Sequence, residues 1–140
     1  TSNLKNNVKM SKISIAKDIR PMLLARESLT ALAGENIFPL YAPEGTVGDF
    51  ILYQRTAGGS EVNQMGLTGE WCEVTFNVVS DDYVKGVEIA EELRSVLQDV
   101  YVGEERDQLV MSNSREDFVG ENNVVKYVQI LVFTVGKSQE

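Results

Sequence analysis

Three groups of acidic residues are the first candidates for chemistry in this 140-residue chain. Asp81 and Asp82 form a pair of carboxylates, the side chains that general acid and base catalysis can use when histidine is not involved. Two further groups carry the oxygen ligands that calcium and magnesium prefer: Glu104, Glu105 and Asp107, and then Glu116, Asp117 and Glu121. A small carboxylate-dependent enzyme or metal-binding domain is therefore one possible class.

Each acidic group also has a structural interpretation. Asp81 and Asp82 follow Ser80 and precede an amphipathic stretch, where such residues usually cap a helix. The other two groups lack the glycine turn and the alternating ligand spacing of a calcium loop, which favours solvated connections. The chain has no histidine, so the commonest general base and metal ligand is missing. We therefore expect no enzyme activity, no metal and no cofactor.

The long connection at residues 57–69 is a better candidate, as a protein interface. It separates two predicted strands, and loops of this length without structure of their own are often binding elements. Its apolar side chains would gain little by facing water. The alternative is a mobile hairpin tip. Gly58 and Gly59 have no following phosphate-binding frame. The candidate interface residues in this connection are Gly58, Gly59, Val62, Met65 and Leu67.

The net charge of −8 is unevenly distributed. Residues 1–26 hold six basic residues and one acid, whereas the remainder holds seven basic and twenty acidic residues, a charge of −13. A strongly acidic body disfavours nucleic-acid binding, because it repels phosphates. The basic N-terminus, with Lys5, Lys9 and Lys12, either pairs with the acidic body of a neighbouring copy or is a solvated tail.

The apolar pattern predicts the elements that would position these residues. Helical spacing covers residues 14–34, interrupted at Pro21 and again near residues 26–28, where Ser28 would cap a short final helix. A second helix follows the Asp81-Asp82 pair and extends to about Val100. Four strands are predicted at residues 50–56, 70–79, 108–112 and 124–135, with a polar turn region at residues 113–123. The single cysteine, Cys72, should be buried in the second strand.

These elements predict one domain of the α+β class. We expect a flexible N-terminal arm at residues 1–12 and a single domain at residues 13–140. The domain would have two layers, a four-stranded, mainly antiparallel sheet packed by two helices in the order α-β-β-α-β-β. The apolar faces of the last strand indicate a central strand or one that meets another chain. No apolar stretch is long enough for a spanning helix and no secretory signal is visible, so we expect a soluble protein that is not exported and has no membrane partner.

Residues 35–59 carry a family resemblance. The chain has Ile37-Phe38-Pro39, then the turn Ala42-Pro43-Glu44-Gly45-Thr46, then the strand Phe50-Ile51-Leu52-Tyr53-Gln54-Arg55. This order resembles the tail-completion, or tail-terminator, proteins of long-tailed bacteriophages and prophages. The similarity extends over about residues 13–135, although Gly48-Asp49 stands where relatives often have a proline before the aromatic residue.

The resemblance implies a structural virion protein. The resemblance implies a ring of several copies, with six expected. The ring would cap the head-proximal end of the tail tube, end its growth and join the tail to the head. The implied partners are further copies of the chain, the tail tube protein and a head-completion or connector protein, with DNA passing through the lumen without sequence-specific binding. The protein would be in the host cytoplasm during assembly and then in the virion. A head-closure or stopper ring is the alternative within the same particle.

Overall fold

The computed structural model describes residues 13–62, 68–102 and 107–136, and the predicted arm lies outside them. The N-terminal helical region is broken into three pieces: the 3₁₀-helix η1 (Ile13–Asp18), α2 (Ile19–Leu24) and α3 (Glu27–Ala33). Pro21 lies in the first turn of α2, where its missing N–H costs nothing. Gly34, at φ 65°, ends α3 as the sequence predicts, but the expected Ser28 cap is wrong, because the N-cap is Arg26.

The strands form one sheet in the order β1-β2-β3-β6-β5-β4. Their bounds are β1 (Ile37–Pro39), β2 (Phe50–Val62), β3 (Thr68–Ser80), β4 (Tyr101–Val102), β5 (Asp107–Glu121) and β6 (Val124–Val135). The pairing of β1 with β2 is parallel and every other pairing is antiparallel. The remaining helix, α4 (Tyr83–Gln98), connects β3 to β4.

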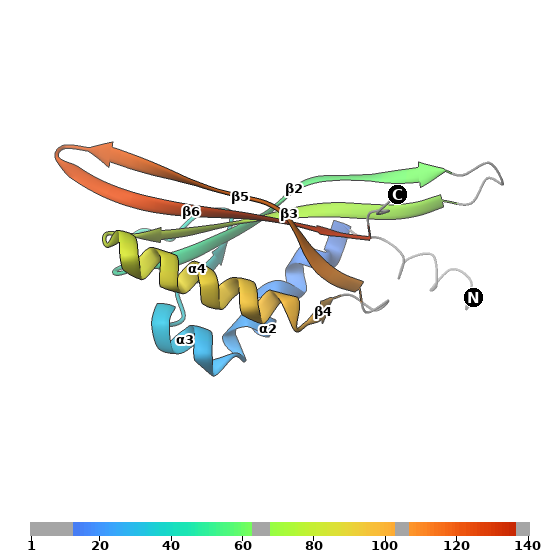
Figure 1. The fold of residues 1–140 in the computed structure, drawn as a ribbon, viewed down its shortest axis with the longest axis horizontal. Helices are drawn as coiled ribbons and strands as arrows, with labels where there is room; N and C mark the ends of the chain where they lie inside the picture. Colours follow the sequence, from blue (N-terminus) through green and yellow to red (C-terminus); the bar gives the residue numbers. More distant parts are fainter. Residues whose placement is uncertain (1–12, 63–67, 103–106, 137–140) are drawn as a thin grey trace.

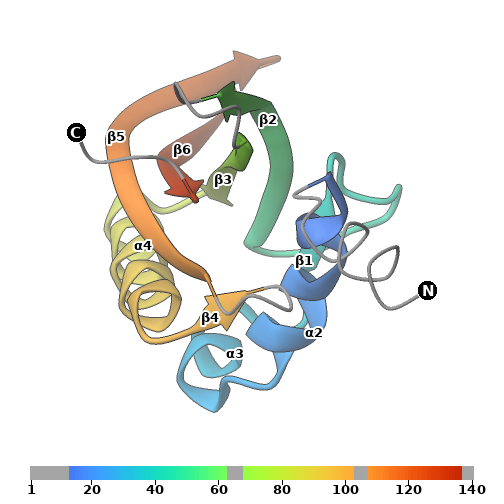
Figure 2. The same cartoon turned by 90° about the vertical axis from the view of Figure 1, so that its right-hand side faces the viewer.

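The predicted sheet was wrong in number and type of strands. The sheet is six-stranded and mixed, and it curls into a half-barrel with three α-helices, where four mainly antiparallel strands and two helices were predicted (Figure 2). The proline turn at Ile37–Pro39 is itself an edge strand parallel to β2, and an edge strand is a position where a sheet tolerates proline. The two-residue β4 is too short for a periodicity signal.

Two connections predicted as loops are long hairpins (Figure 1). Residues 57–62 belong to β2 and pair with residues 68–73 of β3, and residues 113–121 belong to β5 and pair with β6. The β5–β6 turn contains only Asn122 and Asn123, both at positive φ (52° and 68°), as a two-residue hairpin turn of the primed type requires. This turn fixes the register of the whole hairpin.

The main core lies between the sheet and the helices. Its largest fully buried side chains come from every layer: Phe76, Phe133, Ile19, Leu23, Leu29, Ile37, Ile51, Ile89, Leu93, Leu97, Leu109 and Val74. Cys72 is buried here, as predicted. On the opposite face of β6, Val128, Ile130 and Val132 form a second buried cluster with Val79. Of the two alternatives predicted for β6, the structure shows the central strand, because β6 lies between β3 and β5.

Two β-bulges lie across the same level of the central β3–β6 pair. The ladder shifts between Arg55 and Ala57 in β2, and between Met111 and Asn113 in β5. Because a bulge increases local twist, the outer strands bend away from the sheet at this level. The two hairpins project from opposite ends of the molecule, because β2 and β5, which lead into their turns, run in opposite directions (Figure 1).

Candidate assembly surfaces

The two glycines predicted in an interface have a structural role within the β2–β3 hairpin. Gly58 pairs with Cys72 and Gly59 with Trp71. A Cβ on Gly58 would lie 3.3 Å from the Trp71 carbonyl oxygen, and one on Gly59 would lie 3.2 Å from the Trp71 indole nitrogen. Both distances are shorter than ordinary van der Waals contacts, so a larger residue at either position would require Trp71 to shift by a few tenths of an ångström.

The other predicted interface residues are not tested by the structure. Val62 ends β2, whereas Met65 and Leu67 lie outside the described residues, as do Lys5, Lys9 and Lys12. Nothing in the described part of the hairpin contradicts an interface at its tip. The interface role of these residues, and of Gly58 and Gly59, stays a prediction.

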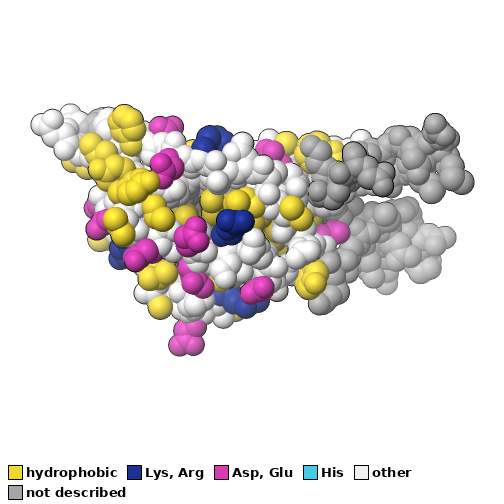
Figure 3. Space-filling model, in the orientation of Figure 1, with side chains coloured by type: hydrophobic (Ala, Val, Ile, Leu, Met, Phe, Trp, Pro, Cys, Tyr) yellow, Lys and Arg dark blue, Asp and Glu magenta, His cyan; other side chains and the backbone are white. Residues whose placement is uncertain are grey.

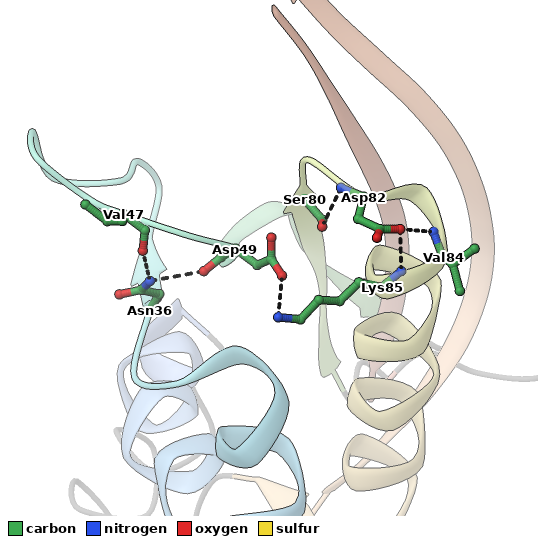
Figure 4. Close-up of polar contacts among 7 residues, drawn as sticks. All are labelled: Asn36, Val47, Asp49, Ser80, Asp82, Val84 and Lys85. Atoms are coloured by element: carbon green, nitrogen blue, oxygen red, sulfur yellow. Dashed lines mark hydrogen bonds and ion pairs between the residues drawn. The ribbon is translucent and has the colours of Figure 1, made fainter.

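The Asp81-Asp82 pair is a structural feature. The Asp82 carboxylate accepts hydrogen bonds from the Val84 N–H at 2.9 Å and the Lys85 N–H at 3.3 Å, as the N-cap of α4 (Figure 4). Asp81 forms an ion pair with Lys126 of β6 at 2.6 Å. The capping interpretation is thus confirmed for Asp82, and the two carboxylates serve different partners.

A polar network ties the proline-turn segment to the start of α4 (Figure 4). The Asn36 side-chain amide donates to the carbonyl oxygens of Val47 (2.9 Å) and Asp49 (3.1 Å). The Asp49 carboxylate, only 12% exposed, pairs with Lys85 at 3.3 Å. These contacts fix the loop that leads the chain into β2.

Glu116 connects β5 to α4. It accepts hydrogen bonds from the Tyr83 hydroxyl and from the Gln129 side chain, the latter at 3.0 Å. The Tyr83 hydrogen bond, followed by that of Gln129, holds the pKa of Glu116 below its ordinary value, and the same bond to Glu116 raises the pKa of Tyr83. Among the described residues, no three histidine, cysteine or acidic side chains come close enough to hold a metal ion.

The end of the β5–β6 hairpin is a surface that the sequence interpretation missed. This hairpin end, residues 117–125, projects past α4 and exposes apolar side chains (Figures 1 and 3). Phe118 is 65% exposed, and Val119, Val124 and Val125 are exposed as well. The pattern of Phe-Val and Val-Val on either side of Asn122-Asn123 is typical of a hairpin, but the surrounding polar residues favoured a turn region.

A second missed feature is a hollow beside β1, the strand at the edge of the sheet far from β5. It has a volume of about 650 Å³. Its floor is apolar and its cationic residues are Lys17, Arg20 and Arg55, with no carboxylate among the lining residues. We call it the basic hollow; it is lined by Ala16, Lys17, Arg20, Pro21, Pro39, Leu40, Tyr53, Gln54 and Arg55.

Two hydrogen bonds fix the elements that line the basic hollow. The Arg20 Nε donates to the Ile37 carbonyl oxygen at 2.6 Å, which anchors α2 to β1. Leu40 takes a positive φ of 70°, rare for this residue type, and its N–H donates to the Tyr53 carbonyl oxygen at 2.9 Å. Burial raises the pKa of Tyr53, so its phenol stays protonated.

Comparison with known proteins identifies the fold. No family model matches the sequence, and no curated protein matches it. The structure is similar to a chain in a solved structure of the "Virion of native gene transfer agent (GTA) particle", with a TM-score of 0.68. The similarity covers 91% of this chain and 100% of that chain at 14% sequence identity. The two chains therefore share a fold across nearly the whole of both. No described helix is long and apolar enough to cross a membrane.

Proposed function

We propose that the protein is a non-enzymatic structural component of a phage-like virion. The observation that carries this proposal is the fold shared with a chain of the gene transfer agent virion over that chain's full length. The contacts of Asp81 and Asp82 support it, because Asp82 caps α4 and Asp81 pairs with Lys126. A protein of this kind acts through surfaces that fit other subunits.

More specifically, we propose a tail terminator that forms a ring at the head-proximal end of the tail tube. The motif resemblance at residues 35–59 supports this assignment. The shape supports it too, because hairpins at opposite ends give each copy two different surfaces (Figure 1). Such heterologous contacts close into a ring when the rotation between copies closes. The ring, of six copies by the family resemblance, would contact the tail tube protein on one side and a head-completion or connector protein on the other.

The acidic body suits a ring through which DNA passes. Beyond residue 26 the chain carries a charge of −13, which disfavours tight phosphate contacts at the lumen. DNA would therefore pass without sequence-specific binding. Changing lumen-facing acids to lysine should slow genome passage or ejection, and unchanged ejection kinetics would count against this part of the proposal.

Electron microscopy of particles made without this protein tests the proposal. A tail terminator predicts overlong tails, or tails of normal length that stay separate from heads. Locating a labelled subunit in intact particles then separates the alternatives. A label at the tube end supports the terminator, whereas a label against the portal supports a head-closure or stopper ring. Normal, joined and infectious particles would overturn the virion role.

A further inference from the structure

The hairpin end and the basic hollow are complementary in polarity. The hairpin end presents Phe118, Val119, Val124 and Val125 to solvent. The basic hollow offers an apolar floor, and its volume of about 650 Å³ falls within the roughly 300–1,000 Å³ typical of pockets that hold a bound group. Apolar side chains exposed together on a rigid projection gain free energy by entering such a site.

Their charges are complementary as well. Residues 115–125 contain three carboxylates, Glu116, Asp117 and Glu121, and one cationic residue, Arg115. Lys126 lies just beyond this range. Lys126 is already paired with Asp81. The charged residues that line the basic hollow are all cations. A cationic site on a chain of net charge −8 favours an acidic partner segment, and residues 115–121 are such a segment.

The strand directions favour a second copy of this chain as the occupant. Beside the hollow, β1 ends at Pro39, and from Gln54 onward the outer edge of β2 has no partner strand among the described residues. The outer edge of β5 likewise pairs with β4 only at Asp107 and Gln108 in the described parts of the chain. Because β2 and β5 run in opposite directions, β5 of one copy can lie antiparallel to the open edge of β2 in a second copy of the same orientation.

We infer that the β5–β6 hairpin end of one copy docks in the basic hollow of the next. Phe118 is the apolar anchor, and the Asp117 carboxylate beside it faces Lys17, Arg20 and Arg55. The hollow and the hairpin end lie on different surfaces, so the contact is heterologous and leaves each copy able to bind a neighbour on both sides. The contact itself does not depend on the proposed function. Only the closure of successive contacts into a ring rests on that proposal.

Site-specific photo-cross-linking tests this contact directly. Placing p-benzoylphenylalanine at position 118 of the full-length chain should give intermolecular adducts, mapped by mass spectrometry to residues 16–21, 39–40 or 53–55. The same group at Val84, which is 63% exposed at the start of α4, is the control. Adducts from position 118 that map elsewhere, or a chain that gives no adducts at its highest soluble concentration, would overturn the inference.

Variants measured by analytical ultracentrifugation supply the energetic test. Phe118→Ser should raise the dissociation constant for self-association about tenfold or more, as expected for an aromatic anchor. Val84→Ser should leave it unchanged. Arg55→Asp should weaken association, and adding Asp117→Arg should restore part of it. Equal dissociation constants for wild type and Phe118→Ser in folded proteins would contradict the docking mode.

These outcomes are distinguishable from a failure of the proposed function. The first such outcome is self-association through Phe118 combined with normal tail length and head joining in particles that lack the protein. It would support the docking contact and contradict the proposed tail-terminator function. The second is overlong tails in the absence of the protein, together with fully assembled rings of the Phe118→Ser variant. It would support the tail-terminator function and contradict the docking contact.

Discussion

The two ends of β6 are alike in composition but differ in environment. Near its C-terminal end, Phe133 and Val135 are fully buried against the helix layer. At its N-terminal end, Val124 and Val125 are 56% and 43% exposed, where the hairpin projects beyond α4 (Figure 1). One strand thus contributes to the core at one end and to a free surface at the other.

This difference shows that apolar content alone does not reveal what a residue does. Where the helices cover the sheet, apolar side chains stabilise the fold, because folding removes them from water. Beyond the helices, the same residue types contribute little to folding and are available to a partner. The two regions should therefore separate in experiments that measure stability and assembly independently.

The largest effect is expected in the covered region, from Phe133→Ala. Phe133 is fully buried and meets Phe76 edge to face, with ring centroids 5.7 Å apart. The free energy of unfolding should fall by about 3–5 kcal/mol, as for other buried aromatic truncations. Urea denaturation followed by circular dichroism measures it. A loss below about 1 kcal/mol would mean that this end of β6 is not part of a tightly packed core.

A smaller effect is expected at the start of α4, from Asp82→Ala. The change removes the acceptor for two helix N–H groups and should cost about 1 kcal/mol of unfolding free energy. Asp81→Ala is the matched control. Its exposed ion pair with Lys126 should contribute only about 0–1 kcal/mol. Equal losses from the two variants would show that the cap does not stabilise the helix layer.

The free energy of unfolding should depend on pH through Glu116, which lies between the two regions. Because the pKa of Glu116 is lowered in the folded protein, its contribution to stability is present above its ordinary pKa of 4.5 and is lost as the pH falls through the folded-state pKa. Tyr83→Phe removes the hydrogen bond that is the main cause of the lowered pKa of Glu116. This variant should therefore lose less unfolding free energy than the wild type as the pH falls. Unfolding free energy measured across this pH range checks it, with Glu116→Gln expected to flatten the same part of the profile.

The smallest effect on stability is expected at the hairpin end, from Phe118→Ala. Phe118 is 65% exposed, so the change should alter the unfolding free energy by no more than about 0.5 kcal/mol. The same denaturation experiment used for Phe133→Ala provides the comparison. A loss approaching that of Phe133→Ala would mean that the hairpin end is part of the folding core.

Local signals in the sequence located most elements of the fold. Alternation found β6 with its observed bounds, the carboxylates before Tyr83 marked the start of α4, and Pro21 and Gly34 marked a break and an end in the N-terminal helices. These features depend on neighbouring residues only. They are therefore visible without knowledge of the tertiary structure.

The errors arose where long-range pairing decides the structure. Polar residues 113–121 lack a clear strand pattern, and they are extended because β6 pairs with them and Asn122-Asn123 fixes the turn. Ile37–Pro39 is a strand only because β2 lies beside it. The basic hollow combines residues 16–21 with residues 39–55, which no local pattern relates. The predicted interface residues near residue 65 and in the N-terminal arm remain to be tested.

The strand order has a consequence for the time course of folding. The hairpins β2–β3 and β5–β6 are local in sequence, but the central pairing of β3 with β6 joins strands separated by α4, β4 and β5. Loop closure makes such distant pairing slow, so we expect both hairpins to form before the sheet is complete. During synthesis, the backbone N–H and C=O groups of β3 that face β6 stay unpaired until β6 has left the ribosome. Pulse-labelling hydrogen exchange should detect this order as late protection of the β3–β6 amides.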